Sequence, residues 1–276
     1  MRKHGATMDD VTVSSRRAML DVLEALAEHR GSIVIVGAHA IYMQLPATQT
    51  GVAPFTRDSD MVIDPEVLLD EPLLEAVLQG AGFTLRNPHH PGTWHRSGDE
   101  LDLMVPYEAG GGGRRAARIP PHATGVARKT RGLEGALVDN DLRDVESLEP
   151  AQDSRKFKVK VAGPAALLVS KLYKLTERLE QGNPDRQQDK DAHDIYRILL
   201  ESEPDQLKTR YQELLETSIS ADVAKNALAY LDELFAAGPT AEGSIMAGRA
   251  EEGIGNPTTV SLQASFLAEE LLNLLR

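Results

Sequence analysis

The sequence predicts a mixed α/β protein: an N-terminal layer of strands and helices over residues 1–162, followed by a C-terminal helical domain over residues 163–276. Two observations support this fold class. In the first half, short β-branched runs such as IVIV at residues 33–36 alternate with amphipathic helical patterns, as in α/β folds. From Gly163 onward, apolar residues recur at helical spacing almost throughout. A chain of 276 residues is long enough to bury two cores of this kind.

The elements follow in chain order. A first helix begins at Ser14 or Ser15, whose side chains suit an N-cap, and Gly31 ends it. The run at residues 33–36 is a buried strand that Gly37 closes with a tight turn. Further strands are expected at residues 59–64, 83–86, 93–96, 101–105 and 156–161, the last as a sheet edge with solvated lysines. Further helices are expected at residues 38–45 and 65–80, and from Pro164, Asp189, Asp205, Ala221 and Pro257.

Composition excludes several classes of protein. A net charge of −12 and a sequence pI near 5.2 argue against a protein that coats nucleic acid or a membrane with its whole surface. The chain has no cysteine, which excludes disulfides, thiolate metal sites and cysteine nucleophiles. It also lacks an apolar stretch that approaches the roughly 18 to 20 residues of a membrane span. We therefore expect a soluble, cytoplasmic protein without membrane partners.

Two acids mark the start of one predicted strand. Asp58 and Asp60 are separated by one residue, so the period of a strand points both carboxylates to the same face. Magnesium prefers hard oxygen ligands of this kind. Arg57, directly before them, could neutralise phosphate charge. Solvated acids on a strand and a solvated arginine are the alternative interpretation, and Gly37 could be only a permissive turn residue.

The order strand, glycine turn, helix, loop and acid-x-acid strand resembles the polymerase-β-like nucleotidyltransferases, through the segments IVIVGAHAIYMQL and TRDSDMVID. More closely, the chain is similar to the AbiEii-like nucleotidyltransferases, a family that includes toxins of toxin–antitoxin pairs. The resemblance implies a nucleoside triphosphate substrate with Mg²⁺ or Mn²⁺ on Asp58 and Asp60, and backbone contacts from Gly37 and Ala38 to the triphosphate. Ala38 departs from the serine or second glycine of that family, so a hydroxyl contact is lost.

A third acid lies on a neighbouring predicted strand. Glu100 and Asp102 alternate with apolar residues, which places both on one strand face. In polymerase-β-like enzymes a third acid completes the metal site or activates the attacking hydroxyl. Asp102, flanked by two leucines, is the better candidate for this role. A half-exposed strand with polar residues turned outward is the alternative.

Two segments of the helical half extend the resemblance, LLVSKLYKLTERL and KDAHDIYRIL. They are similar to paired AbiEii-like motifs in which a lysine and an aspartate face the nucleotide. By this match, Lys171 contacts phosphate, and Asp191 holds the lysine or serves as a base. Asp194, three residues further on, is a second candidate for nucleotide binding. A structural salt bridge between two helices would explain the same residue types.

A glycine-rich and basic stretch interrupts the first half between residues 109 and 133. Four consecutive glycines precede six basic residues without an intervening acid, and we expect a mobile or partner-dependent segment. Its charge could bind an RNA backbone, although a solvated loop is the alternative. The six residues are Arg114, Arg115, Arg118, Arg128, Lys129 and Arg131.

Together these features predict a metal-dependent nucleotidyltransferase with nucleotide between its two domains and Asp102 or Asp191 assisting the incoming hydroxyl. The toxin resemblance implies an RNA such as a tRNA end as acceptor, and a cognate antitoxin as partner. Three alternatives stay open. The chain could modify a small molecule such as an antibiotic, bind a nucleotide or partner without catalysis, or be an interaction protein whose acids are surface residues.

Overall fold

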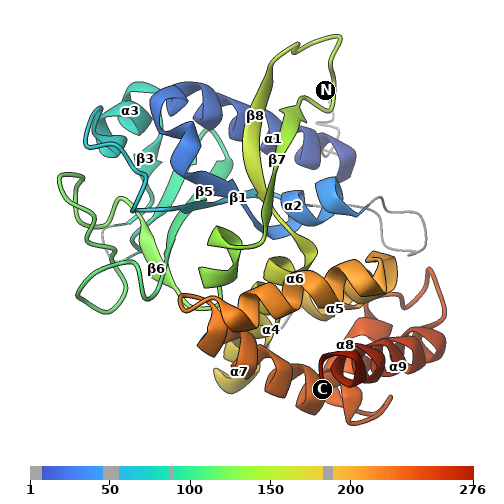
Figure 1. Ribbon diagram of the computed structural model, residues 1–276. Coiled ribbons are helices and arrows are strands. Elements are labelled where there is room, and N and C mark those ends of the chain that lie inside the picture. Colours follow the sequence, from blue (N-terminus) through green and yellow to red (C-terminus); the bar gives the residue numbers. More distant parts are fainter. Residues whose placement is uncertain (1–7, 46–55, 88–89, 183–188) are drawn as a thin grey trace. The chain divides into compact units, whose positions relative to one another are not determined.

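The computed structural model describes residues 8–45, 56–87, 90–182 and 189–276, and it shows a mixed α/β protein with a C-terminal helical region (Figure 1). The chain forms two compact units. The first unit comprises Met1–His39, Pro54–Thr130 and Asn140–Val161. The second unit comprises Ala40–Ala53, Arg131–Asp139 and Ala162–Arg276. The division into two domains at residue 162 stays a prediction.

The first unit is built on a mixed, open sheet of order β3-β4-β5-β2-β1-β8-β7, with β6 paired to β5 off this path. Its strands are β1 (Ile33–Ile35), β2 (Asp58–Ile63), β3 (Thr84–Leu85), β4 (Thr93–Arg96), β5 (Asp99–Pro106), β6 (Arg128–Thr130), β7 (Asn140–Glu146) and β8 (Lys156–Ala162). β2 runs antiparallel to β1 and parallel to β5, with Asp60 directly opposite Asp102. The acids of β2 and β5 therefore lie side by side near the middle of the sheet.

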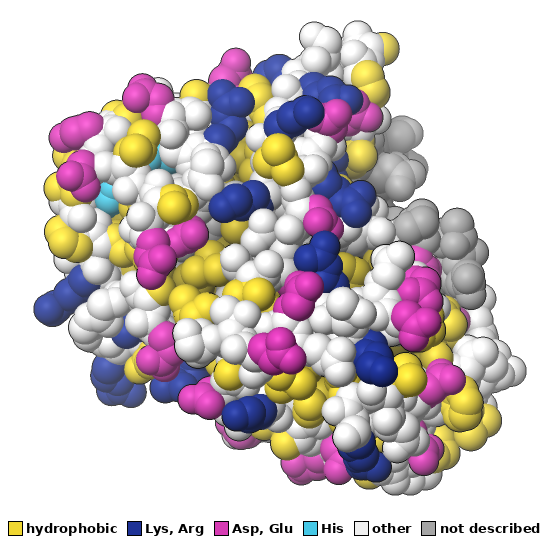
Figure 2. Space-filling view, in the orientation of Figure 1, with side chains coloured by type: hydrophobic (Ala, Val, Ile, Leu, Met, Phe, Trp, Pro, Cys, Tyr) yellow, Lys and Arg dark blue, Asp and Glu magenta, His cyan; other side chains and the backbone are white. Residues whose placement is uncertain are grey.

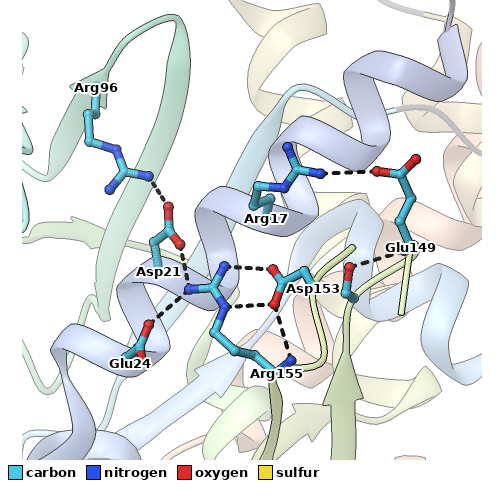
Figure 3. Close-up of polar contacts among 8 residues, drawn as sticks. Arg17, Asp21, Glu24, Arg96, Glu149, Asp153 and Arg155 are labelled. Carbon is cyan, nitrogen blue, oxygen red and sulfur yellow. Dashed lines mark hydrogen bonds and ion pairs between the residues drawn. The ribbon is translucent and has the colours of Figure 1, made fainter. Parts of the chain in front are cut away.

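Helix α1 (Met8–Ala25) packs on β2 and β5, and a network of charged side chains holds it in place. Figure 3 shows the Arg155 guanidinium pointing toward acids on two sides. Its nitrogens lie 2.5 Å from Asp21 and 2.9 Å from Glu24, both on α1, and 2.7 Å from Asp153. Arg96 of β4 also pairs with Asp21. The network therefore ties α1 to β4 and to the connection between β7 and β8.

Several expected elements differ from the structure. The helix expected from Pro65 begins only at Leu74, as α3 (Leu74–Gly80), because Pro72 interrupts any helix across the preceding residues. The first helix starts before Ser14, so the two serines are not its N-cap. The strand at residues 156–161 was expected at an edge, but β8 lies between β1 and β7. Strands β6 and β7 were not predicted.

The glycine-rich stretch, which was expected to be mobile or partner-dependent, has hydrogen bonds within itself, and its mobility stays a prediction. Its backbone folds back on itself, since the Arg118 amide donates to the Gly110 carbonyl and the Lys129 amide to the Arg115 carbonyl. The side chain of Lys129 donates to the Gly111 carbonyl at 2.5 Å and stacks on the Tyr107 ring. This stretch thus closes against β6 by internal hydrogen bonds.

The second unit contains helices at the positions expected from sequence, together with α8, which was not predicted. They are α4 (Pro164–Glu180), α5 (Asp189–Glu201), α6 (Pro204–Glu216), α7 (Ala221–Leu231), α8 (Glu242–Arg249) and α9 (Pro257–Leu275). Helix α2 (Gly37–Gln44) follows β1, with its first turn in the first unit. Within the described ranges, none of the helices has the length and apolar character needed to cross a membrane.

Candidate functional site

The first element of the candidate site is the turn at Gly37. Gly37 has φ +69°, in the left-handed region that suits glycine. A Cβ at this position would meet the Asp60 carboxylate and lie 2.9 Å from Asp60 Cβ and Cγ. The Val36 amide also donates to the Asp60 carbonyl at 3.0 Å. The turn and the second acid of β2 are therefore in direct contact, and only glycine leaves room for that carboxylate.

The turn opens directly into α2, whose first residues are Gly37, Ala38 and His39. The first amides of a helix have no carbonyl partner within the helix, and the helix dipole favours negative charge there. Ala38 is buried, so this residue offers a ligand its backbone but no polar side chain. The arrangement can therefore bind an anion through backbone groups.

Four carboxylates share one face of the two central parallel strands, and we call this set the acid face: Asp58, Asp60, Glu100 and Asp102. The register pairs Asp58 with Glu100 and Asp60 with Asp102. Ser59, between the two β2 acids, points the other way and donates to the Ser15 carbonyl of α1 at 3.0 Å. The strand geometry expected from sequence thus places these acids together.

The two β5 residues of the acid face each have an arginine partner. Glu100 lies 2.7 Å from Arg86, and Asp102 lies 2.8 Å from Arg128. Asp102 also accepts a hydrogen bond of 2.7 Å from the Thr93 hydroxyl through its other oxygen. Both oxygens of Asp102 are thus engaged by groups of the protein itself.

A buried polar cluster supports the first turn of α2, and sequence reasoning missed it. His39 Nε2 lies 2.9 Å from Ser15 Oγ, and His39 Nδ1 lies 3.4 Å from an Arg16 nitrogen. Arg16 donates to the Glu146 carbonyl at 3.0 Å, and burial lowers its pKa to about 10 despite the nearby Glu146 charge. The guanidinium stays protonated at neutral pH and adds positive charge behind the Gly37 turn. His39 stood within the quoted motif, but no sequence signal pointed to Arg16.

The basic and acidic residues predicted in the helical half also meet, within the second unit. Lys171 of α4 lies 2.6 Å from Asp194 and 3.3 Å from Asp191, both on α5. Lys174 and Arg178 also pair with Asp191. Burial would raise the pKa of Asp191, but the charges of Lys171, Lys174 and Arg178 outweigh it and lower this pKa to about 2. The cluster is a set of ion pairs between α4 and α5 with more cations than acids. A structural salt bridge between the two helices, the alternative interpretation of the sequence, would have the same residues in contact.

The six basic residues of the glycine-rich stretch have different surroundings. Arg128 pairs with Asp102, and Lys129 donates to backbone carbonyls of the same stretch. Arg131 is exposed and belongs to the second unit. Three arginines of the first unit are exposed, namely Arg114, Arg115 and Arg118. At the lower left of Figure 2, Lys and Arg side chains gather near the loops that Figure 1 draws in green.

Carboxylate oxygens are the donors that Mg²⁺ and Mn²⁺ prefer, so the chemistry of Asp58 and Asp60 fits a metal. Asp58 is exposed and Asp60 half-buried, which leaves the pair within reach of an ion. In the described part of the chain, however, no three His, Asp or Glu side chains converge to hold a metal ion. Arg57 is exposed just before this pair, at the start of β2.

Comparison with known proteins adds no assignment: neither a scan against models of protein families nor a search of curated proteins found a match for this chain.

Proposed function

We propose that the chain is a magnesium-dependent nucleotidyltransferase that transfers a nucleoside monophosphate from a nucleoside triphosphate to a hydroxyl group of RNA, a tRNA in particular. The observation that carries the proposal is the contact of Asp60 with the Gly37 turn. It puts a carboxylate suited to a metal beside helix amides suited to phosphate. Both groups are needed to bind a metal–triphosphate complex, and they come from segments more than twenty residues apart.

In this proposal Asp58 and Asp60 would hold Mg²⁺ or Mn²⁺, which neutralises negative charge on the phosphates when it is bound. Amides of Gly37 and Ala38 contact phosphate oxygens, and Arg16 adds positive charge behind them through His39. Arg57, which is exposed just before β2, is a further candidate to neutralise phosphate charge. The predicted roles of Lys171, Asp191 and Asp194 toward the nucleotide are part of the proposal and rest on the quoted helical segments.

The reaction is an in-line displacement. The acceptor oxygen forms a bond to the α-phosphorus, and the bond from that phosphorus to the oxygen bridging to the β-phosphorus breaks. Pyrophosphate leaves with that oxygen and its electron pair, and the proton of the hydroxyl is released to solvent. Since little covalent chemistry is asked of the protein, positioning and charge stabilisation account for the rate.

RNA as acceptor is supported by the exposed arginines of the first unit, Arg114, Arg115 and Arg118, in a chain of net charge −12. Cations that contact phosphates give binding that weakens steeply with salt. A toxin role with an antitoxin partner rests on the resemblance to the AbiEii-like family. An enzyme acting on a small molecule would not need these three arginines.

The deciding experiment incubates the protein with each radiolabelled nucleotide, Mg²⁺ and total RNA. Label is expected in tRNA with the wild-type protein and not with the double variant Asp58→Asn, Asp60→Asn. If neither protein labels RNA, and Mg²⁺ with nucleotide does not shift the melting temperature of the wild type, the proposal is wrong.

A second experiment tests the acceptor class. The triple variant of Arg114, Arg115 and Arg118 to Gln should weaken tRNA binding and reduce the slope of log affinity against log salt by roughly 2 to 3. A control variant carries Gln at three exposed cations elsewhere, Arg143, Lys158 and Lys225, and should retain the wild-type slope. Equal labelling of RNA by both variants would favour an acceptor that these arginines do not bind.

A further inference from the structure

Asp102 has surroundings that differ from those of a metal ligand. β5 pairs with β2 on one side. On its other side β5 pairs first with β4, where Thr93 is opposite Asp102, and then with β6, where Arg128 is opposite Met104. Both oxygens of Asp102 bind groups from that second side, Thr93 at 2.7 Å and Arg128 at 2.8 Å. Both carboxylate oxygens are therefore engaged by groups from β4 and β6, although Asp102 is directly opposite Asp60 of β2 in the sheet.

Arg128 is held at three points. Besides Asp102, its guanidinium lies 3.4 Å from the Thr93 hydroxyl and 3.3 Å from the Met104 sulfur. A guanidinium has five N–H donors in a planar fork, so donors are left over after these contacts. About a third of the side chain is exposed, against about a seventh for Asp102. Asp102 is thus the enclosed partner, and Arg128 is the one that presents charge to solvent.

We propose that Asp102 is a positioning residue that fixes Arg128 on the β6 side of β5, and that Arg128 contacts the triphosphate of the bound nucleotide, while Asp102 is not a third metal ligand. The proposal rests on the proposed nucleotidyltransferase function. A planar guanidinium suits a phosphate because two parallel N–H donors can bind two of its oxygens. The acid face would then bind metal through β2 alone, in agreement with the lack of three converging ligands in the described part of the chain.

The test separates metal affinity from nucleotide affinity. Mn²⁺ binding is measured by electron paramagnetic resonance with the metal alone. Binding of the Mg²⁺ complex of each nucleotide is measured by calorimetry. The variants are Asp60→Asn, Asp102→Ala, Arg128→Gln and the double variant of Asp102 and Arg128, with Asp102→Asn in reserve if the alanine variant does not fold. Melting temperatures report whether each variant is folded.

Asp60→Asn is expected to lose Mn²⁺ binding, whereas Asp102→Ala retains it within about twofold. Asp102→Ala and Arg128→Gln should each lose roughly 10- to 100-fold in nucleotide affinity, the range for a charge-assisted hydrogen bond. The double variant should be no worse than either single one, because Asp102 acts through Arg128. Arg128→Lys, which keeps the charge but not the fork, should recover part of the affinity.

The chain offers a matched control on the same strand. Glu100→Gln and Arg86→Gln break an acid–arginine pair of similar length two residues away, 2.7 Å against 2.8 Å. Both control variants should keep wild-type affinity for Mn²⁺ and for nucleotide.

Loss of Mn²⁺ binding in Asp102→Ala would make Asp102 a metal ligand and overturn this inference while the proposed function stands. Unchanged nucleotide affinity in Arg128→Gln, or independent losses that multiply in the double variant, would also overturn it. A wild-type protein that binds neither Mn²⁺ nor any nucleotide would instead refute the proposed function, and this inference with it.

Discussion

Replacing Gly37 by alanine is expected to destabilise the protein and to displace the Asp60 carboxylate. The backbone at Gly37 has φ +69°, which an L-residue adopts only at a cost. The added methyl group would also meet the carboxylate of Asp60 and lie 2.9 Å from its Cβ and Cγ. Asp60 sits on a strand paired on both sides, so the side chain must move before the backbone can.

The two contributions can be given magnitudes. The left-handed conformation costs an L-residue roughly 1–2 kcal/mol. Forcing an extra carbon into a packed site costs roughly 1–3 kcal/mol. The sum for Gly37→Ala is therefore roughly 2–5 kcal/mol in the free energy of unfolding, provided that the site relaxes as ordinary cores do.

Gly253 offers the matched control, since it has φ +82° and nothing lies within 4 Å of its would-be Cβ. Gly253→Ala should cost only the conformational part, roughly 1–2 kcal/mol. Urea unfolding, followed by circular dichroism, measures both variants, and Mn²⁺ binding is measured on each. Equal destabilisation by the two substitutions would refute the reasoning about Asp60, and so would wild-type Mn²⁺ affinity in Gly37→Ala.

Three further predictions concern polar contacts that each lie within a single unit. The hydrogen bond from Arg155 lowers the pKa of Asp153 to about 2, below the value of about 3.9 in an unfolded chain. The stabilisation from the Asp153–Arg155 hydrogen bond is therefore present above about pH 4 and lost as the pH falls through 2. On acid titration, Asp153→Asn should show a shallower loss of stability than the wild type. Lys171→Met leaves buried Asp194 without its partner at 2.6 Å and should cost roughly 3–5 kcal/mol. Adding Asp194→Asn should recover part of that loss in urea unfolding, and failure to recover would contradict the ion-pair account. Asp139, buried, accepts a 3.0 Å bond from the Ala166 amide at the start of α4. Asp139→Ala should therefore lower the melting temperature more than Asn256→Ala, which removes the exposed cap of α9 at roughly 1 kcal/mol; equal losses would show that burial adds nothing.

Local periodicity was sufficient for much of the candidate site. Alternation placed Asp58 and Asp60 on one face of β2, and the β-branched run ending at Gly37 predicted both a buried strand and its turn. The helices from Ala221 and Pro257 begin at the expected residues, because an acid or a proline in the first turn and a regular apolar face are local signals.

Sheet order could not be predicted in the same way. The strand at residues 156–161 has alternating lysines, which suggested an edge, yet β8 pairs with β1 in the interior of the sheet. Its neighbour β7, with the sequence NDLRDVE, is too polar to show a strand pattern. An alternating strand reports that one face is solvated, and it contains no information about which strands lie beside it.

The same distinction explains why equal acid-x-acid patterns on β2 and β5 have different chemical surroundings. Both patterns put two carboxylates on one sheet face. The neighbours of β5 supply Arg128 and Thr93 to Asp102, whereas the turn after β1 places Gly37 against Asp60. An arginine or a glycine turn can thus be assigned as the neighbour of a carboxylate only once the adjacent strand is known, because each strand contributes its own charges to the acid beside it. The pattern of a strand defines the face on which an acid lies. The neighbouring strands define whether that acid lies against an arginine, as Asp102 does, or against a glycine turn, as Asp60 does.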